Sequence, residues 1–348
     1  MLPAIVAAVR GFGRVESALD LFSGTSRVGR ALKQAGLRVT SNDHLAFAAA
    51  LARCYVEADA REHRDEAARL IAELARVPPE AGYFTQTFCV EARYVQPENG
   101  ARIDAIRDAI ARRGLPPVLE AIALTSLMEA ADRVDSTTGV QMAYLKEWAR
   151  RSYKPLELRV PELLAGPGRA LGLDAAEAAE IEVDVAYLDP PYNQHSYLGN
   201  YHVWETLVRW DAPESYGVAR KRADCREYKN AFNSRRRIGP ALAEVIARVR
   251  APHLVVSFSD EGFLAREELE AMLAPRGHVR VVATDFKRYV GAQIGIYNAG
   301  GEKVGKVSHL RNTEMLFVVS RDRDAAERAA AAARSALAGP LVATPAPP

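Results

Sequence analysis

Apolar and polar positions along the first 55 residues follow the periods of strands and helices. An apolar run at Ala18–Phe22 precedes a break and then helical spacing at Arg27–Ala35. Gly36 ends that helix, Leu37–Thr40 is a second apolar run, and Ala46–Tyr55 has the composition of a helix. The pattern predicts a strand-helix-strand-helix unit, with which a doubly wound α/β sheet opens.

Helical spacing dominates from residue 60 to residue 165. The expected helices are Glu66–Arg76, Arg102–Arg113, Val118–Arg133 and Gln141–Arg151, with prolines between them. We interpret this part as a helical insertion between two parts of the sheet.

Strand-like runs return after the insertion. They are Val183–Leu188, Leu254–Phe258, Val279–Ala283 and Met315–Ser320, and the last two predict an antiparallel pair. A helix is expected at Arg266–Leu273, and an Ala-rich helix with a Pro-rich end follows Arg321. The predicted parts are therefore a sheet domain in two pieces, 1–59 and 166–322, an insert at 60–165, and an Ala- and Pro-rich tail at 323–348.

Composition narrows the class of protein. The chain has 348 residues, 49% of them hydrophobic and 26% charged, which is typical of a soluble protein with a large core. We expect no membrane span and, because Met1–Arg10 lacks a basic start and a cleavage site, no signal peptide. Cys54, Cys89 and Cys225 have neither disulfide nor zinc spacing, which favours a reducing cytoplasm and predicts no metal site.

The tetrapeptide Asp189-Pro190-Pro191-Tyr192 directly follows the apolar run Val183–Leu188. Ligands of open α/β sheets bind at the carboxyl ends of strands, so a carboxylate and an aromatic ring are expected there. The prolines restrict the turn and remove backbone donors, which leaves carbonyl oxygens as acceptors. An exocyclic amine on a stacked base matches these groups, whereas a plain strand-ending turn is the alternative.

A loop of small residues follows the first predicted strand. Glycine and hydroxyl residues let the backbone approach a ligand closely, and an ordinary β-to-α turn is equally compatible with them. The candidate ligand-binding residues are Asp20, Phe22, Ser23, Gly24 and Thr25.

Two acidic residues are further candidates. Asp43 ends the second predicted strand, about 20 residues beyond the loop, a position suited to ribose hydroxyls. Asp174 precedes another helical run. For both residues, capping of a helix N-terminus is an equally good interpretation.

Amide, aromatic and basic side chains are dense after the tetrapeptide. Asn193, His195 and Tyr197 suit a pocket for a flipped base, and His195 as a general base is the less favoured reading. Ser257–Asp260 ends a strand and is better explained as a turn than as pocket lining. A basic stretch favours contact with a polyanion, although a solvated face is the usual explanation. Its candidate nucleic-acid contacts are Arg220, Lys221, Arg222, Arg235, Arg236 and Arg237.

Taken in order, these motifs resemble the D12 class of adenine-specific DNA methyltransferases, which includes the Dam-like enzymes. The resemblance runs from about Ala18 to Ser320. It implies a Rossmann-like methyltransferase sheet that is the catalytic domain, with the helical insert recognising the target in double-stranded DNA. It also implies transfer of methyl from S-adenosylmethionine to adenine N6, and a cognate restriction endonuclease as a candidate partner.

The resemblance assigns roles residue by residue. The candidate cofactor ligands are Asp20, Phe22, Ser23, Gly24, Thr25, Asp43, Asp174 and Asp189. Asp189 and the Pro190 carbonyl would accept hydrogen bonds from the target amine, Pro191 would shape the turn, and Tyr192 would stack on the base.

One family feature has no match here. The Gly-x-Lys-type element ahead of the first strand is absent from residues 1–17, so either Gly11–Arg14 substitutes for it or that wall of the pocket is built differently. An RNA adenine methyltransferase and a catalytically silent nucleic-acid-binding protein remain alternatives. A nicotinamide dehydrogenase is disfavoured because the full Gly-x-Gly-x-x-Gly motif is missing.

Overall fold

The computed structural model describes residues 1–145, 147–287, 296–297, 303–305 and 311–338. These residues form two compact units. One comprises residues 16–181 and 195–230 and is called here the glycine-loop unit. The other comprises residues 1–15, 182–194 and the described residues from 231 onward, and is called the tetrapeptide unit.

Three parallel strands organise the glycine-loop unit. They are β1 (Ser17–Asp20), β2 (Arg38–Asn42) and β3 (Gly168–Leu171), in the order β3-β2-β1. Helix α2 (Arg27–Gln34) joins β1 to β2, and α3 (Ala46–Ala52) follows β2 and continues as a π-helical turn to Glu57. The predicted strand-helix-strand-helix opening is therefore confirmed, whereas β3 was not anticipated.

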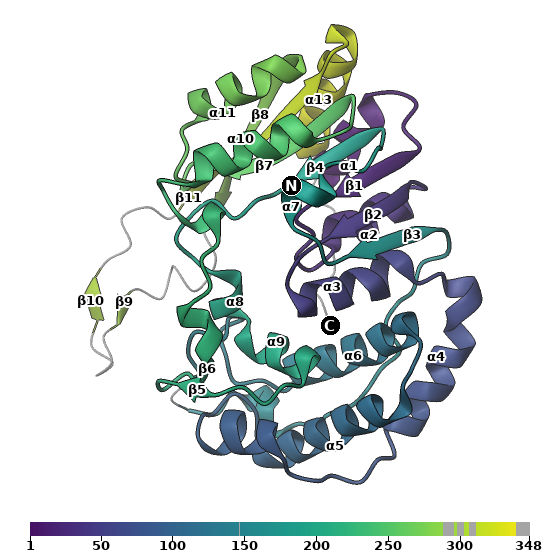
Figure 1. The fold of residues 1–348 in the computed structure, drawn as a ribbon, viewed down its shortest axis with the longest axis vertical. Helices are drawn as coiled ribbons and strands as arrows, with labels where there is room; N and C mark the ends of the chain where they lie inside the picture. Colours follow the sequence, from purple (N-terminus) through teal and green to yellow (C-terminus); the bar gives the residue numbers. More distant parts are fainter. Residues whose placement is uncertain (146, 288–295, 298–302, 306–310, 339–348) are drawn as a thin grey trace. The chain divides into compact units, whose positions relative to one another are not determined.

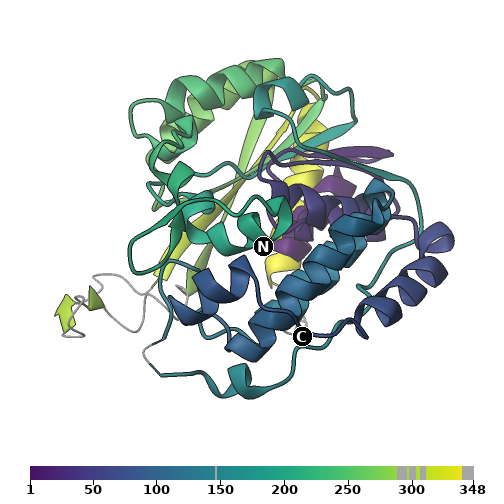
Figure 2. The same ribbon diagram turned by 60° about the horizontal axis from the view of Figure 1, so that its bottom comes forward.

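Helices make up most of the rest of this unit. The long ones are α4 (Ala60–Leu74), α5 (Pro97–Arg113) and α6 (Pro117–Asp132), drawn in blue in Figure 2. Their apolar faces meet in a core that includes Ile103, Ile106, Ile122 and Leu127. Short elements complete the unit: a π-helical turn Thr85–Val90, a 3-10 turn Arg150–Tyr153, α7 (Ala175–Ala178), α8 (Tyr197–Asn200), α9 (His202–Arg209), the hairpin β5 (Ser215–Tyr216) with β6 (Lys221–Arg222), and a 3-10 turn Ala223–Arg226.

The expectation of a helix at Gln141–Arg151 is wrong. The described residues there form turns and extended chain until the 3-10 turn begins at Arg150. Gly139 has a φ of +95°, which breaks the chain direction just before this segment. Gln141 is buried, and its side chain bonds to another helix, so tertiary contacts override the apolar spacing of the segment.

Four strands organise the tetrapeptide unit, in the order β4-β7-β11-β8 (Figure 1). Strand β4 (Val185–Leu188) runs parallel to β7 (His253–Ser259), and β11 (Arg311–Ser320) is antiparallel to β7 and to β8 (His278–Lys287). The predicted antiparallel pair is therefore confirmed. Two short strands, β9 (Ile296–Tyr297) and β10 (Lys303–Gly305), pair with each other.

Helices cover these strands. They are α1 (Leu2–Gly11), α10 (Ile238–Arg248), α11 (Arg266–Leu273) and α13 (Arg323–Ala338), with 3-10 turns at Ala231–Asn233 and Ala274–Arg276. The predicted helix after Arg321 is thus confirmed, and its Pro-rich end lies outside the described residues.

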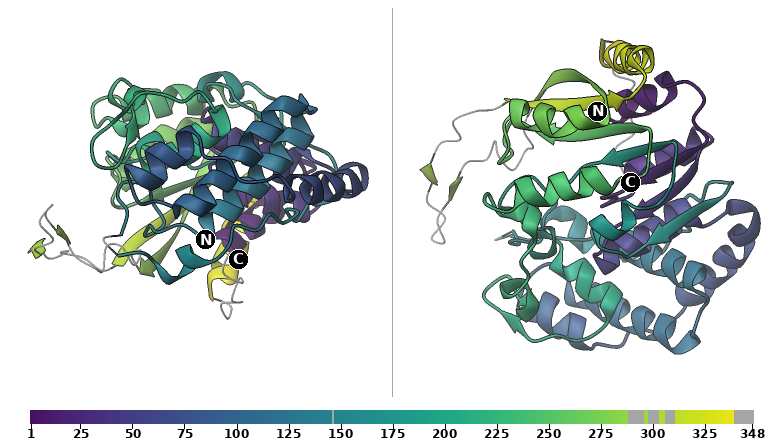
Figure 3. Two further views of the ribbon diagram at one scale, coloured as in Figure 1. Left: turned by 90° about the horizontal axis from the view of Figure 1, so that it is seen from below. Right: turned by 45° about the horizontal axis from the view of Figure 1, so that its top comes forward.

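Helices α1 and α13 lie side by side, as the right view of Figure 3 shows in purple and yellow. A Cβ atom at Gly11 would lie 2.6 Å from Ala329 Cα, so only glycine allows this packing. The face of α13 is built from small buried residues, among them Ala326 and Ala330. The first glycine of the Gly11–Arg14 segment therefore has a packing role.

The chain has the mixed α/β, Rossmann-like fold that the sequence predicted, with parallel strands followed by a late antiparallel pair. The boundaries of the compact units differ from the predicted boundaries at 59, 165 and 322. The units consist of residues that contact one another, whereas the predicted parts were defined by the periodicity of the sequence. In the described part of the chain, no helix has the length and apolarity needed to cross a membrane.

Candidate active site

Asp20, at the end of β1, fixes the start of α2. Its Oδ2 accepts a hydrogen bond of 2.8 Å from the Gly29 backbone N–H. A Cβ at Gly29 would lie 2.9 Å from that same oxygen and would also press on the Ser41 hydroxyl. Glycine is therefore required at this position for α2 to approach the carboxylate, and Asp20 is only 1% exposed.

Asp43, at the end of β2, connects the glycine loop to α3. Oδ2 accepts from the Gly24 N–H and Oδ1 from the Leu45 N–H, both at 3.0 Å. Gly24 has a φ of +49°, a conformation that favours glycine. Burial raises the pKa of the Asp43 carboxyl, and the two backbone hydrogen bonds oppose that rise. The helix-start role considered from the sequence is thus present, and it leaves open the proposed contact with a ribose.

Asn42 bridges three strand ends in the same unit. Its Nδ2 donates to the carbonyls of Leu21 at 3.3 Å and Leu173 at 3.2 Å, and its Oδ1 accepts from the Leu173 N–H at 2.9 Å. Asp174, the next residue, is exposed and caps α7 by accepting from the Ala176 N–H at 2.8 Å. The capping interpretation of Asp174 therefore describes its contact in this structure.

The glycine loop also presents unused polar atoms. The hydroxyls of Ser23 and Ser26 are buried and have no hydrogen-bond partner among the described residues. Buried polar atoms without a partner are costly, so a polar ligand at the loop would relieve that cost. Phe22 is half-buried and Thr25 is exposed beside them. This donor and acceptor set fits a nucleoside cofactor with ribose hydroxyls.

The tetrapeptide begins directly after β4. Asp189 is exposed at the surface, while the protein atoms packed around its carboxylate partly desolvate it. Desolvation, followed by the negative charge of Glu314, raises the pKa of Asp189 to about 7, and a hydrogen bond from Tyr187 opposes the rise. A carboxyl with so perturbed a pKa at a strand end is typical of a functional site.

Tyr192 is held by its neighbours in the tetrapeptide unit. Its ring centre lies 5.4 Å from that of Phe258, and its carbonyl accepts a 2.8 Å hydrogen bond from the Phe263 N–H. Burial, and secondarily the charges of Glu314 and Asp189, raise the pKa of its phenol to about 12, so the ring stays neutral. Pro190 is buried and Pro191 half-buried.

Strand β7 takes part in this cluster more than the sequence suggested. Phe258 packs on Tyr192, and burial raises the pKa of both Tyr192 and Glu314 while the Ser259 side chain opposes these rises. The sequence analysis did not identify Glu314, because this residue directly precedes Met315–Ser320, the apolar run that predicted the last strand. In the structure β11 already begins at Arg311, and Glu314 lies opposite Ser259 in the antiparallel register.

The predicted nucleic-acid contacts are divided between the units. In the tetrapeptide unit, Asn193 accepts through its carbonyl from Asn233 Nδ2 at 2.8 Å, and Arg235 lies over the Phe263 ring at 5.1 Å. Arg235, Arg236 and Arg237 are all exposed. In the glycine-loop unit, His195 and Tyr197 are exposed and Lys221 is half-buried.

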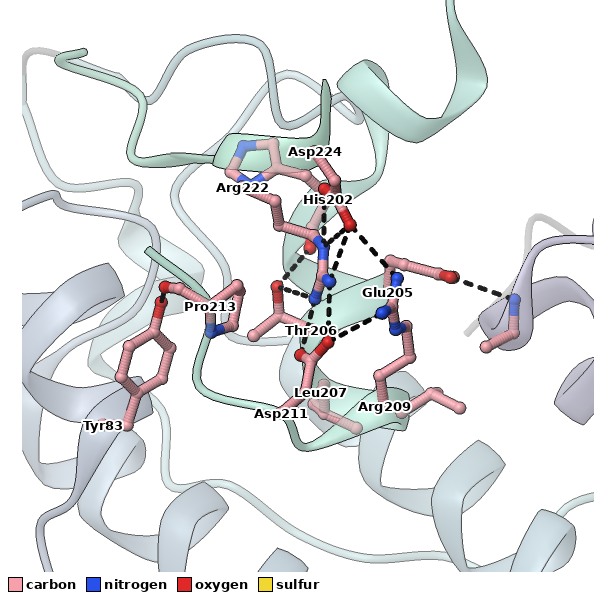
Figure 4. A network of polar contacts seen from close by, with 12 residues as sticks. Tyr83, His202, Glu205, Thr206, Leu207, Arg209, Asp211, Pro213, Arg222 and Asp224 are labelled. Carbon is pink, nitrogen blue, oxygen red and sulfur yellow. Dashed lines mark hydrogen bonds and ion pairs between the residues drawn. The ribbon is translucent and has the colours of Figure 1, made fainter. Parts of the chain in front are cut away.

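Arg222 is a correction to the predicted contacts. Its side chain is 1% exposed and makes a two-pronged ion pair with Asp211, both distances being 2.7 Å. It also donates to Asp224 at 2.9 Å and to Thr206 Oγ1 at 3.3 Å (Figure 4). Arg209 pairs with both carboxylates from the other side. Because its donors are already engaged, we withdraw Arg222 as a phosphate contact. Arg220 is less committed, with one ion pair to Glu91 at 3.1 Å.

The sequence of this chain matches one family of known proteins. The family model for the D12 class N6 adenine-specific DNA methyltransferase matches residues 1–250. The chain is 31% identical over 293 residues to the type II methyltransferase M.FokI of Planomicrobium okeanokoites, a match that covers 78% of this chain and 45% of that protein. It is 28% identical over 282 residues to the type II methyltransferase M.NlaIII of Neisseria lactamica, covering 78% and 83%.

A third relative is the modification methylase StsI of Streptococcus sanguinis, 28% identical over 297 residues, with 80% of this chain and 45% of that protein covered. The chain thus spans less than half the length of M.FokI and StsI and most of M.NlaIII. Because the family model matches more than half of the chain, the chain belongs to the D12 class of N6 adenine-specific DNA methyltransferases.

Proposed function

We propose that this protein transfers a methyl group from S-adenosylmethionine to the N6 atom of adenine at a specific sequence in double-stranded DNA. The observation that carries the proposal is Asp189-Pro190-Pro191-Tyr192 at the carboxyl end of β4, in a chain of this family. The names of its relatives, which are type II and modification methyltransferases, support a role in restriction-modification.

The chemistry requires help because adenine N6 is a poor nucleophile, its lone pair being delocalised into the ring. We assign Asp189 and the Pro190 carbonyl as acceptors for the two N6 hydrogens. Acceptors in these places favour a pyramidal nitrogen and stabilise the positive charge that develops as the N–C bond forms and the bond between the methyl group and the sulfonium breaks. The neutral thioether would be the leaving group, and the Asp189 carboxylate would accept the proton that N6 loses. Tyr192 offers a neutral ring on which a base turned out of the helix can stack.

When bound, S-adenosylmethionine supplies an electrophilic methyl group on a sulfonium. Asp43 is the residue that we assign to its ribose, because that carboxylate ends a parallel strand. The hydroxyls of Ser23 and Ser26 add polar atoms that lack partners among the described residues. We assign Asp20 to ordering the loop, since it holds the Gly29 N–H.

For the DNA, the exposed arginines Arg235, Arg236 and Arg237 are the proposed phosphate contacts, together with Lys221. The helical residues 60–165 remain the proposed target-recognition part. A cognate endonuclease as partner and a cytoplasmic location belong to the same proposal.

The decisive experiment measures transfer of tritiated methyl from S-adenosylmethionine to unmethylated genomic DNA and to matched RNA. We expect labelled DNA that yields N6-methyladenine on digestion and no label in RNA. Asp189→Ala should abolish transfer, while Glu182→Ala, which removes an 83% exposed carboxylate from the same stretch, should not.

Other outcomes would replace the proposal. Label in RNA alone would indicate an RNA methyltransferase, and N4-methylcytosine would indicate the same chemistry on another base. Binding of DNA without any transfer would indicate a silent binding protein of this fold.

A further inference from the structure

Glu205 is a buried carboxylate that the proposed chemistry does not use. It lies on α9 and is 4% exposed. Its Oε1 accepts a hydrogen bond of 3.2 Å from the Ala46 N–H, and its Oε2 accepts one of 3.1 Å from the Phe47 N–H. These are the first two residues of α3, whose N–H groups have no partner inside their own helix. Both carboxylate oxygens are thus aimed at one helix start.

The same turn contains Asp43. Leu45, which directly precedes α3, donates its N–H to Asp43 Oδ1 at 3.0 Å. Three successive N–H groups, those of Leu45, Ala46 and Phe47, are therefore held by two carboxylates. Asp43 uses its other oxygen for Gly24 in the glycine loop. A shift of the α3 start would consequently move the carboxylate that orders that loop.

Helix α9 is itself fixed at both ends. At its start, the Gln141 Oε1 accepts from the Val203 N–H at 2.9 Å and the Trp204 N–H at 3.4 Å. Toward its end, Thr206 accepts from Arg222, which is in turn paired with Asp211 and Asp224 (Figure 4). Figure 4 also shows the Glu205 side chain reaching away from this network to its backbone partner. Glu205 is therefore presented from a rigid support, as a positioning group requires.

We infer that Glu205 is a positioning residue for cofactor binding, which holds the Asp43 turn in the conformation that receives S-adenosylmethionine. The inference rests on the proposed function, in which Asp43 binds the cofactor ribose. Two charge-assisted hydrogen bonds to a helix start oppose part of the cost of burying the carboxylate. Glu205 does not contact reacting atoms in this scheme, so its loss acts on cofactor affinity and leaves the chemical step nearly unchanged.

The test uses Glu205→Gln, Asp43→Asn and the double variant in the full chain. Glutamine keeps the shape of the side chain, but its NH₂ group faces a backbone N–H in place of an acceptor. We expect Glu205→Gln to raise the dissociation constant of S-adenosylmethionine, measured by calorimetry, by roughly 10-fold, with kcat at saturating cofactor within about twofold of wild type. Glu73→Gln, which changes a 62% exposed side chain on α4, is the matched control and should change neither.

A double-mutant cycle decides whether Glu205 acts through Asp43. If it does, adding Glu205→Gln to Asp43→Asn weakens cofactor binding by much less than it weakens the wild type. Additive effects would overturn the inference, and so would a fall in kcat and melting temperature with unchanged cofactor affinity, since that marks a merely structural role. Calorimetry measures the binding of S-adenosylmethionine without DNA. A failure of methyl transfer to DNA would therefore refute the proposed function, while the binding measurement would still test the role of Glu205.

Discussion

Replacing Arg222 separates a structural arginine from one that binds DNA. Its guanidinium contacts Asp211 at 2.7 and 2.7 Å, Asp224 at 2.9 Å and Thr206 at 3.3 Å, and it is 1% exposed. Arg222→Met keeps much of the apolar length of the side chain and removes every one of these bonds. The hairpin β5–β6 would then lose its polar attachment to α9.

The magnitude follows from what is left behind. Breaking a buried ion pair costs about 3–5 kcal/mol when the remaining charge is fully buried. Here the side chains of Asp211 and Asp224 are 31% and 39% exposed. Arg209 still pairs with them at 3.0 and 3.1 Å. Both facts favour the lower end of the range, so we expect a loss of about 3 kcal/mol in the free energy of unfolding, or a fall of roughly 4 °C in melting temperature for a chain of 348 residues.

Two assays check this expectation. Circular dichroism gives the melting temperature, and fluorescence anisotropy on a short duplex gives the DNA affinity over a range of salt concentrations. Each phosphate contact contributes about −0.9 to the slope of log affinity against log salt. Arg222→Met should leave that slope unchanged, whereas Arg236→Met, at an exposed position, should make it shallower by about 0.9 without destabilising the protein.

The reverse result would refute the reasoning. If Arg222→Met melts within about 1 °C of wild type, the ion-pair network contributes little to stability. If it also flattens the salt dependence, Arg222 is a phosphate contact after all, as the sequence alone suggested.

Three further predictions follow from the described contacts. Because the pKa of Asp189 is raised to about 7 and its role needs the carboxylate, kcat/KM for methyl transfer should fall as pH drops below 7. The raised pKa also means that the stability of the protein declines as pH rises from about 4 toward 7, so Asp189→Asn should raise the melting temperature at pH 8 and not at pH 4. A difference in melting temperature between variant and wild type that is the same at both pH values would contradict this prediction. Gly29→Ala should lower the free energy of unfolding by about 1–3 kcal/mol and weaken cofactor binding, because the added Cβ displaces the Asp20 carboxylate. Gly239→Ala is the control: its Cβ would lie 3.8 Å from the nearest atom, so its melting temperature should equal that of the wild type. Asp104→Ala should lower the free energy of unfolding, measured in urea, by about 3–5 kcal/mol, since the carboxylate is 2% exposed and accepts hydrogen bonds from three backbone N–H groups and a hydroxyl at 2.6–2.9 Å. A decrease below about 1 kcal/mol would show that water takes the place of the carboxylate.

Local periodicity was sufficient for much of the fold. The runs that became β1, α2 and β2 have the strict spacing of their elements, and their order alone indicates a wound α/β sheet. The tetrapeptide and the loop with Gly24 were recognisable because their chemistry lies in consecutive residues. Such signals need no knowledge of which distant segments meet.

The wrong predictions concern residues whose conformation or burial depends on contacts with segments far away in the chain. Gln141–Arg151 has helical spacing, yet Gln141 bonds to the start of α9, 62 residues away, and the segment is not a helix. Arg222 belongs to a basic stretch, and its burial depends on α9 and the hairpin closing around it. Nothing in the sequence around Glu205 indicates its role, because the backbone N–H groups that it binds, those of Ala46 and Phe47, lie 159 and 158 residues away in the chain.

The sequence by itself determined the opening strand-helix-strand-helix unit, the late antiparallel strands, the family and the residue types at the two candidate clusters. The tertiary structure decided which charged groups are available to a ligand and which are consumed by the fold. The physical reason is that a carboxylate or guanidinium has the same covalent structure in both cases, while its solvation and its partners come from residues far away in the chain.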